Sequence, residues 1–76
     1  MKAQQMLDQA INELSNLNPG EKFIVKDLFI GYIWNRCARS ERLLLGTLFL
    51  NYVKQNLNKI NLLDKTSSGQ QQYKII

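Results

Sequence analysis

The sequence contains no histidine, and its only cysteine is Cys37. With one thiol there is no internal disulfide, and without an imidazole neither a Cys–His nucleophile pair nor the usual zinc site can form. The few acidic residues make no carboxylate pair within one element, and there is no glycine-rich phosphate-binding loop. We therefore expect no catalytic activity, no cofactor and no metal ion, and we interpret Cys37 as a small, partly buried thiol.

Long apolar runs are missing as well. The longest, residues 43–50, has eight residues including Gly46 and Thr47, whereas a helix that spans a bilayer needs about 20 apolar residues. Residues 1–5 are not followed by the hydrophobic core of a signal peptide. The chain is also too short to enclose a deep pocket for a small-molecule substrate. The simplest expectation is a cytoplasmic protein that neither enters a membrane nor acts on a small molecule.

The size and composition fit one small globular domain. The chain has 76 residues, of which 45% are hydrophobic, an ordinary fraction for a soluble protein. A chain this small buries only about 60% of the surface that it exposes when unfolded. Nearly every apolar stripe must therefore face the same core, and we expect a single domain over residues 1–76.

Positive charge is concentrated in the second half of the chain. Residues 1–35 carry three lysines and four acidic residues, a net charge of −1. Residues 36–76 carry seven basic and two acidic residues, a net charge of +5, and the two halves together give +4. A small domain with a basic half attracts polyanions such as nucleic acids, although lysines placed for solubility produce the same imbalance.

The first residues predict an amphipathic helix. Apolar side chains recur at positions i, i+3 and i+4, the spacing that places them on one helical face. They are Ala3, Met6, Leu7, Ala10, Ile11, Leu14 and Leu17. Because Pro19 disfavours the helical conformation at Asn18 and Gly20 permits a sharp turn, we expect the helix to end there after about fifteen residues.

In the middle of the chain, the spacing of the apolar residues changes twice. Residues 21–25 are β-branched and aromatic, with Phe23 and Val25 on one side, which predicts a short strand. Helical spacing begins at Lys26, and we expect Gly31 to end or bend that helix. We interpret the aromatic residues of this segment as core anchors, the alternative being a platform on which bases of single-stranded nucleic acid stack. These residues are Phe29, Tyr32 and Trp34.

A long helix is predicted over residues 41–56. Ser40 is expected as its N-cap, and Glu41 lies in the first turn, where a carboxylate is favoured. At about 100° per residue, a broad arc of apolar side chains faces the core. This arc contains Leu45, Leu48, Phe49, Tyr52, Val53 and Leu57, with Leu43 and Leu44 at its borders. The opposite, exposed arc contains Thr47, Asn51, Lys54 and Gln55.

The last nineteen residues predict a β-hairpin. Ile60 and Leu62 alternate with polar neighbours before a polar turn, and Tyr73 and Ile75 alternate after it. Because an isolated hairpin is marginal in water, we expect it to pair with the short strand that follows the first helix. The four apolar residues would then close the core over the helices.

The expected order is helix, strand, helix, helix, strand, strand, an α+β arrangement of three helices packed on a small antiparallel sheet. It is similar to the winged helix-turn-helix order, in which a strand between the first two helices pairs with a C-terminal hairpin. Few small α+β domains place a single strand there, so the resemblance implies a winged-helix fold. In that fold the third helix enters the DNA major groove and the hairpin forms the wing.

Three blocks of the sequence resemble a family of small uncharacterised proteins from Gram-positive bacteria, their phages and mobile elements. They are residues 20–29 with Gly31 and Trp34, then Arg42, Leu45, Gly46 and Phe49, and finally Gln71 and Tyr73. The resemblance covers about residues 14–76. It implies the fold and a phage or mobile-element setting, and it carries no established activity.

In a winged helix, the basic half would supply residues that bind duplex DNA. Asn51 can hold adenine through two hydrogen bonds, Thr47 can contact a thymine methyl group or a phosphate, and Lys54 can contact a phosphate or guanine. The arginines can bind backbone phosphates, and the polar turn can approach the adjacent backbone or minor groove. The expected DNA-binding residues are Arg36, Arg39, Arg42, Thr47, Asn51, Lys54, Lys65, Ser67, Ser68 and Gln70. Such a protein would regulate transcription or another process of a phage or mobile element.

Two alternatives stay open. The polar arc and the polar turn need no function, because a helix must present some polar side to water and a turn is usually solvated. Leu43, Leu44 and Leu50 border the polar arc, and such a surface suits a protein partner or a homodimer. The alternative function is a protein-interaction module of winged-helix shape, such as an antirepressor or host-factor inhibitor, that does not bind DNA.

Overall fold

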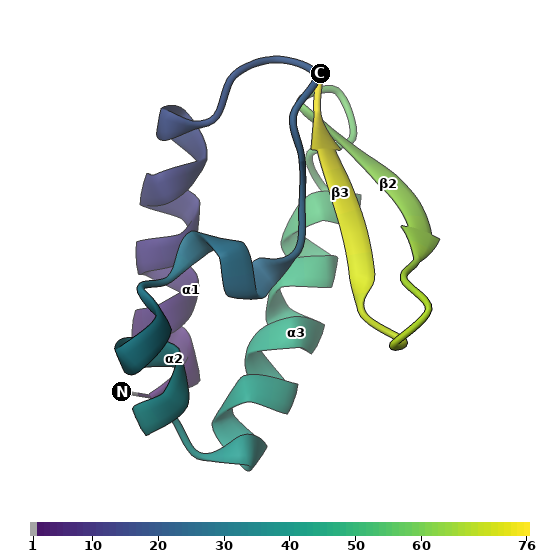
Figure 1. Ribbon diagram of the computed structural model, residues 1–76. Helices are drawn as coiled ribbons and strands as arrows, with labels where there is room; N and C mark the ends of the chain where they lie inside the picture. Colours follow the sequence, from purple (N-terminus) through teal and green to yellow (C-terminus); the bar gives the residue numbers. More distant parts are fainter. Residues whose placement is uncertain (1) are drawn as a thin grey trace.

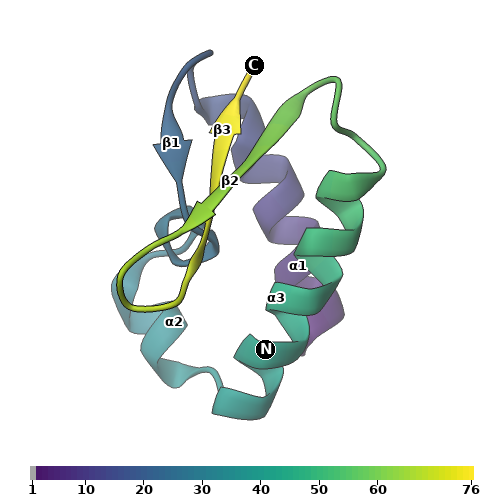
Figure 2. The same ribbon diagram turned by 90° about the vertical axis from the view of Figure 1, so that its right-hand side faces the viewer.

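The computed structural model describes residues 2–76, which form three α-helices and a three-stranded antiparallel sheet (Figure 1; β1 is labelled in Figure 2). The elements are α1 (Ala3–Glu13), β1 (Lys22–Phe23), α2 (Gly31–Arg36), α3 (Arg39–Lys54), β2 (Ile60–Lys65) and β3 (Gln71–Ile75), with 3-10 turns at Leu14–Asn16 and Val25–Leu28. The α+β class and the expected order of elements are confirmed. No helix in this part of the chain combines the length and the apolarity that a bilayer span requires.

β3 is the central strand of the sheet, with β1 on one side and β2 on the other. Tyr73 of β3 lies opposite Phe23 of β1 and Leu62 of β2, so the strand that follows α1 pairs with the hairpin as expected. Just before β1, the Gly20 N–H donates a hydrogen bond to the Ile75 carbonyl at 2.7 Å. Gly20 has a φ of 90°, which glycine adopts without strain, and this turn leads the chain from α1 into the sheet.

The segment between β1 and α2 differs from the predicted helix. β1 is two residues long, and the Asp27 carboxylate closes the next 3-10 turn by accepting a hydrogen bond from the Ile24 N–H at 3.0 Å. The chain is then extended at Phe29, and α2 begins at Gly31, the residue that we expected to end or bend a helix. Leu28 ends the 3-10 turn and Phe29 follows it, and both side chains lie in the core, where they are 6% and 8% exposed.

α3 begins two residues before its predicted start. Its N-cap is Ala38 rather than Ser40, and no side chain caps the helix. Cys37 is extended and only 5% exposed, so the short link after α2 places the thiol in the core. Glu41 lies in the first turn of α3 as expected, and its carboxylate accepts a hydrogen bond from the Ala3 N–H at 2.7 Å. This contact ties the start of α3 to the start of α1.

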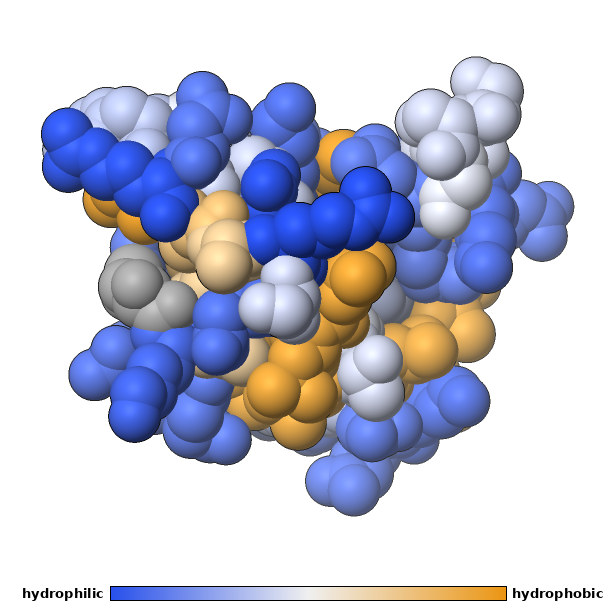
Figure 3. Space-filling model, turned by 90° about the horizontal axis from the view of Figure 1, so that it is seen from below, coloured by the Kyte–Doolittle hydropathy of each residue, from blue (hydrophilic) through white to orange (hydrophobic). Residues whose placement is uncertain are grey.

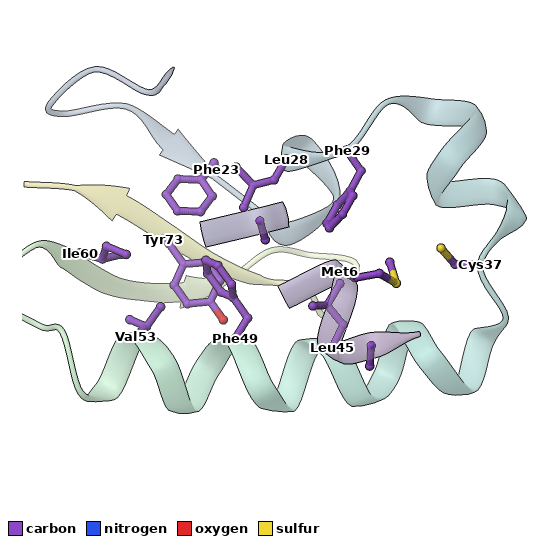
Figure 4. Close-up of a cluster of buried hydrophobic side chains, with 12 residues drawn as sticks. Met6, Phe23, Leu28, Phe29, Cys37, Leu45, Phe49, Val53, Ile60 and Tyr73 are labelled. Carbon is purple, nitrogen blue, oxygen red and sulfur yellow. The ribbon is translucent and has the colours of Figure 1, made fainter. Parts of the chain in front are cut away.

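Three aromatic rings join α3 to the sheet within the core. Phe49 of α3 and Tyr73 of β3 have ring centres 5.0 Å apart in an edge-to-face arrangement, and Phe23 of β1 lies 5.6 Å from Tyr73 (Figure 4). Such a pair stabilises by about 0.5–1.5 kcal/mol beyond the area that it buries. The buried hydrophobic residues are Ala3, Met6, Ala10, Phe23, Leu28, Phe29, Cys37, Leu45, Phe49, Val53, Ile60 and Tyr73.

Three residues that we expected in the core are exposed instead. Tyr32 is 56% exposed because α2 has only six residues, and its neighbours Ile33 and Trp34 pack against the core in its place. Leu57 is 52% exposed because α3 ends at Lys54, three residues before it. Leu62 is 42% exposed because β2 is an outer strand of the sheet.

Candidate nucleic-acid interface

A groove lies between α3 and the β2–β3 hairpin. We call it the α3–hairpin groove. Figure 2 shows the ribbons of α3 and the hairpin on the side turned toward the viewer. α3 contributes Arg39, Arg42, Leu43, Gly46, Thr47 and Leu50. The hairpin contributes Lys65, Ser68, Gly69, Gln70 and Gln71. The lining is completed by Ile24, Val25, Lys26, Trp34 and Tyr73.

The wall formed by α3 follows from its sequence spacing. From Arg39 onward, its groove residues stand at i, i+3, i+4, i+7, i+8 and i+11, which puts them on one side of a helix. Leu45, Phe49 and Val53 repeat every four residues on the neighbouring side, where their exposed fraction is 0%. One helix therefore anchors the core and lines the groove.

The turn of the hairpin is closed by hydrogen bonds within residues 66–70. The Thr66 N–H donates to the Gln70 carbonyl at 2.7 Å, and the Gly69 N–H donates to the Thr66 carbonyl at 2.9 Å. The Thr66 hydroxyl accepts a further bond from the Gln70 N–H at 3.1 Å. Gly69 has a φ of 87°, which a residue with a side chain rarely adopts. These contacts define the position of the polar turn beside the groove.

A register shift places the hairpin residues next to the turn. β2 shifts against β3 between Leu62 and Lys65, and the Gln71 side-chain amide donates a hydrogen bond to the Leu63 carbonyl in this irregular part. Shifts of this kind bend a strand and change the direction of its side chains. Lys65 and Gln71 pair beyond the shift, and both line the groove.

The lining of the groove is cationic. Lys26, Arg39, Arg42 and Lys65 carry positive charge, and none of the described residues that line it is an aspartate or a glutamate. Like charges around one groove raise the local electrostatic potential and attract polyanions, most strongly at low salt. The groove therefore suits a row of phosphates.

Arg42 is held against Trp34 at the side of this groove. Its guanidinium carbon lies 5.6 Å from the centre of the indole ring, within the range of a cation–π contact. Its Nε atom is buried and makes no hydrogen bond to any residue from 2 to 76. A buried unpaired donor costs about 1–3 kcal/mol, so fold stability alone would not favour an arginine here. The contact orients a guanidinium beside the groove.

Polar residues continue along the exposed side of α3. Thr47, Asn51 and Lys54 stand at i, i+4 and i+7 and are all exposed. The Thr47 hydroxyl donates to the Leu43 carbonyl at 3.4 Å, which leaves its methyl group and oxygen lone pairs free for other contacts. This side of α3 offers hydrogen-bonding groups to a ligand that also fills the groove.

Six of the ten residues expected to bind DNA line the groove: Arg39, Arg42, Thr47, Lys65, Ser68 and Gln70. The other four are not among the lining residues. Asn51 and Lys54 are on the exposed side of α3, and Ser67 is at the tip of the turn. Arg36 is at the end of α2, where its guanidinium carbon lies 5.0 Å from the centre of the Tyr32 ring.

Lys26, Trp34 and Gly46 are among the groove residues that we did not expect to bind DNA. Lys26 and Trp34 lie outside α3 and the hairpin, and only the tertiary fold brings them to the groove. Gly46 lies within α3 and lines the same groove. A glycine in the middle of a strongly patterned helix was a signal available in the sequence.

Apolar side chains are also exposed on α3. Leu43 is 61% exposed and lines the groove, whereas Leu44 is 50% exposed and lies outside it. Seen from the end at which α2 joins α3, apolar side chains form a stripe bordered by polar and charged residues (Figure 3). α3 therefore combines a cationic groove with exposed leucines.

Other reactive groups are held within the fold. The Cys37 thiol donates a hydrogen bond to the Ile33 carbonyl at 3.2 Å. Burial raises the pKa of the Tyr73 hydroxyl above its ordinary value. Within residues 2–76, no three Cys, Asp or Glu side chains are grouped so that they could hold a metal ion. The groove itself offers positive charge and hydrogen-bond donors.

Comparison with known proteins gives one match. No curated protein and no solved structure matches the chain. A family model described as Domain of unknown function (DUF1413) matches residues 8–74, a stretch that contains every residue lining the α3–hairpin groove. The expectation of a family of small uncharacterised proteins is thereby confirmed. The chain belongs to the DUF1413 family.

Proposed function

We propose that the protein has a winged-helix fold and binds duplex DNA non-covalently through α3 and the β2–β3 hairpin. The order of elements and the strand order β1-β3-β2 support this fold. α2 and α3 are joined by Cys37 and Ala38 alone, which supports a helix-turn-helix pair. α3 is then the recognition helix, and the hairpin is the wing.

The observation that carries the proposal is the cationic groove between a helix and a hairpin. With α3 in the major groove and the wing against the adjacent backbone or minor groove, one phosphodiester strand runs between them. The α3–hairpin groove has this position, and its charged residues are Lys26, Arg39, Arg42 and Lys65. Contacts between such cations and phosphates supply essentially all of the affinity for non-specific DNA.

Base contacts come from the exposed side of α3. Asn51 holds adenine, Lys54 contacts guanine or a phosphate, and the Thr47 methyl group contacts a thymine methyl group. Leu43, which is 61% exposed, supplies a further apolar contact to thymine. At the wing, Ser67, Ser68 and Gln70 contact the backbone, and Arg36 adds charge beside it. The proposed role is regulation of transcription in a phage or mobile-element setting.

Fluorescence anisotropy with labelled duplex DNA of mixed sequence tests this proposal. We expect the logarithm of the affinity to fall linearly with the logarithm of the salt concentration, because the bound lysine and arginine side chains release counterions from the DNA. Arg39→Ala should reduce the magnitude of that slope by about 1. Lys59→Ala removes the same charge outside the groove and should leave the slope almost unchanged. Absence of binding at low salt would overturn the proposal.

A second candidate function rests on the exposed leucines. Leu43 and Leu44 are 61% and 50% exposed, and Leu44 lies outside the groove. These leucines fit a protein-interaction module, such as an antirepressor or host-factor inhibitor, or a homodimer. Sedimentation of wild type and Leu44→Ala tests self-association, and capture of a host protein that depends on Leu44 but not on Arg39 would favour the module.

A further inference from the structure

Gly46 lies in the middle of α3, where glycine is a poor choice for helix stability. It has seven helical residues before it and eight after it. Glycine at such a position destabilises a helix relative to alanine, because it loses more backbone freedom on folding. A reason for the glycine must therefore come from its surroundings.

The protein itself gives no such reason. A Cβ built on Gly46 would meet no atom within 4 Å outside its immediate neighbours and its own helix backbone. Positive φ values occur only at Gly20 and Gly69 among the described residues, so Gly46 has a conformation that alanine also adopts. Neither core packing nor backbone geometry requires a glycine here.

The open space beside Gly46 is the α3–hairpin groove. Gly46 lies one turn after Arg42 and one turn before Leu50, and all three line the groove. Without a side chain, the surface of the helix at this point is lower than at the neighbouring turns. A bound strand can approach the helix backbone there while Arg42 and Arg39 reach its phosphates.

We infer that the phosphodiester strand passes closest to α3 at Gly46, and that the missing side chain allows this approach. The inference rests on the proposed function and deepens it by naming the point of closest contact. Glycine is the residue that permits a backbone to approach a ligand closely. A methyl group at position 46 fills the space and moves the strand away from the cations of the groove.

The variant Gly46→Ala tests this inference, with Gly31→Ala as its matched control. Gly31 also has open space around the position of a Cβ and a conformation that alanine adopts, but it starts α2 and lies outside the groove. The measurements are the thermal midpoint of unfolding and the affinity for a labelled duplex of mixed sequence at low salt.

Gly46→Ala should raise the thermal midpoint by roughly 4 °C or more, because alanine stabilises a helix interior. It should also weaken DNA binding roughly tenfold, the effect of losing one charge-assisted hydrogen bond. Gly31→Ala should bind DNA like wild type. A gain in stability with a loss of binding separates a ligand role from a structural one.

Three results would overturn the inference. If Gly46→Ala binds DNA as tightly as Gly31→Ala, the strand does not approach Gly46, although the proposed function stands. If Gly46→Ala is less stable than wild type, the fold itself requires the glycine. If wild type binds no duplex DNA, the proposed function fails and the inference fails with it.

Discussion

At the scale of single residues, Tyr73 belongs to both the core and the α3–hairpin groove. It is 1% exposed, its ring centre lies 5.0 Å from that of Phe49, and it also lines the α3–hairpin groove. Packing of this ring therefore holds β3 and the hairpin in place beside α3. A change in the charge of its hydroxyl group should affect the fold directly.

Stability should decrease in alkaline solution because of Tyr73. Burial raises the pKa of its hydroxyl above the ordinary value of about 10, so the unfolded chain loses this proton first. Above about pH 10 the unfolded state binds fewer protons than the folded state, and the free energy of unfolding falls as pH rises.

The test is the thermal midpoint of unfolding, followed by circular dichroism at neutral pH and above pH 10. We expect the thermal midpoint of Tyr73→Phe to fall less between neutral pH and alkaline pH than the midpoint of wild type does. Tyr32→Phe keeps Tyr73 and should behave like wild type. Equal losses in wild type and Tyr73→Phe would contradict the role of Tyr73.

Arg42 should matter more for binding than for stability. Arg42→Met removes the charge and the unpaired Nε while keeping an apolar side chain against Trp34. The lost cation–π contact is worth about 0.5–1 kcal/mol, and the unpaired donor costs about 1–3 kcal/mol, so the free energy of unfolding should not decrease.

DNA affinity of Arg42→Met should fall tenfold or more, about 1.4 kcal/mol, because a phosphate contact is lost. Lys59→Met is the control, since it removes one charge outside the groove. Urea unfolding and anisotropy measure the two quantities. An unchanged affinity would show that Arg42 does not contact DNA.

At the scale of elements, the start of α3 depends on α1. Glu41 accepts a hydrogen bond from the Ala3 N–H at 2.7 Å, and Ala38 caps α3 without a side chain. This carboxylate therefore satisfies a free N–H of α1 and lies where the dipole of α3 favours negative charge. α1 and α3 also pack along each other.

Loss of this contact should destabilise the whole fold. We expect Glu41→Ala to lower the free energy of unfolding by about 1.5 kcal/mol, the low end for a hydrogen bond to a charged group. Asp8→Ala removes an exposed carboxylate of α1 and should change the free energy of unfolding by less than about 0.5 kcal/mol. Urea unfolding measures both variants. Equal effects would mean that Glu41 contributes only as a surface charge.

The sequence predicted which elements form better than it predicted where they begin. The change from helical to alternating apolar spacing revealed α1, α3 and the hairpin, because each buries one face. It failed at Gly31, because the chain is extended at Phe29 and α2 begins at Gly31 instead of ending or bending there. It failed at Ser40, because α3 begins at Arg39 and its N-cap is Ala38, which has no capping side chain.

At the scale of the whole molecule, the uneven charge of the sequence becomes a cationic groove. Arg39, Arg42 and Thr47 were predictable because the spacing within one helix gathers them on one side. Lys26 was not predictable, because it belongs to the acidic half of the chain and reaches the groove only through the tertiary fold. The sequence therefore indicated six of the sixteen described residues that line the groove, and segments outside α3 and the hairpin, such as the one that carries Lys26, are brought to it by the tertiary fold.

The most direct test of DNA binding through the groove is an NMR titration of the isotope-labelled protein with a short duplex of mixed sequence. The amide signals of Arg42, Gly46, Thr47 and Gln70 should shift or broaden as DNA is added. Those of Ser15 and Lys59, which lie together at a separate surface, should stay in place. Shifts confined to Leu44 and its neighbours outside the groove, or no shifts at low salt, would contradict this account.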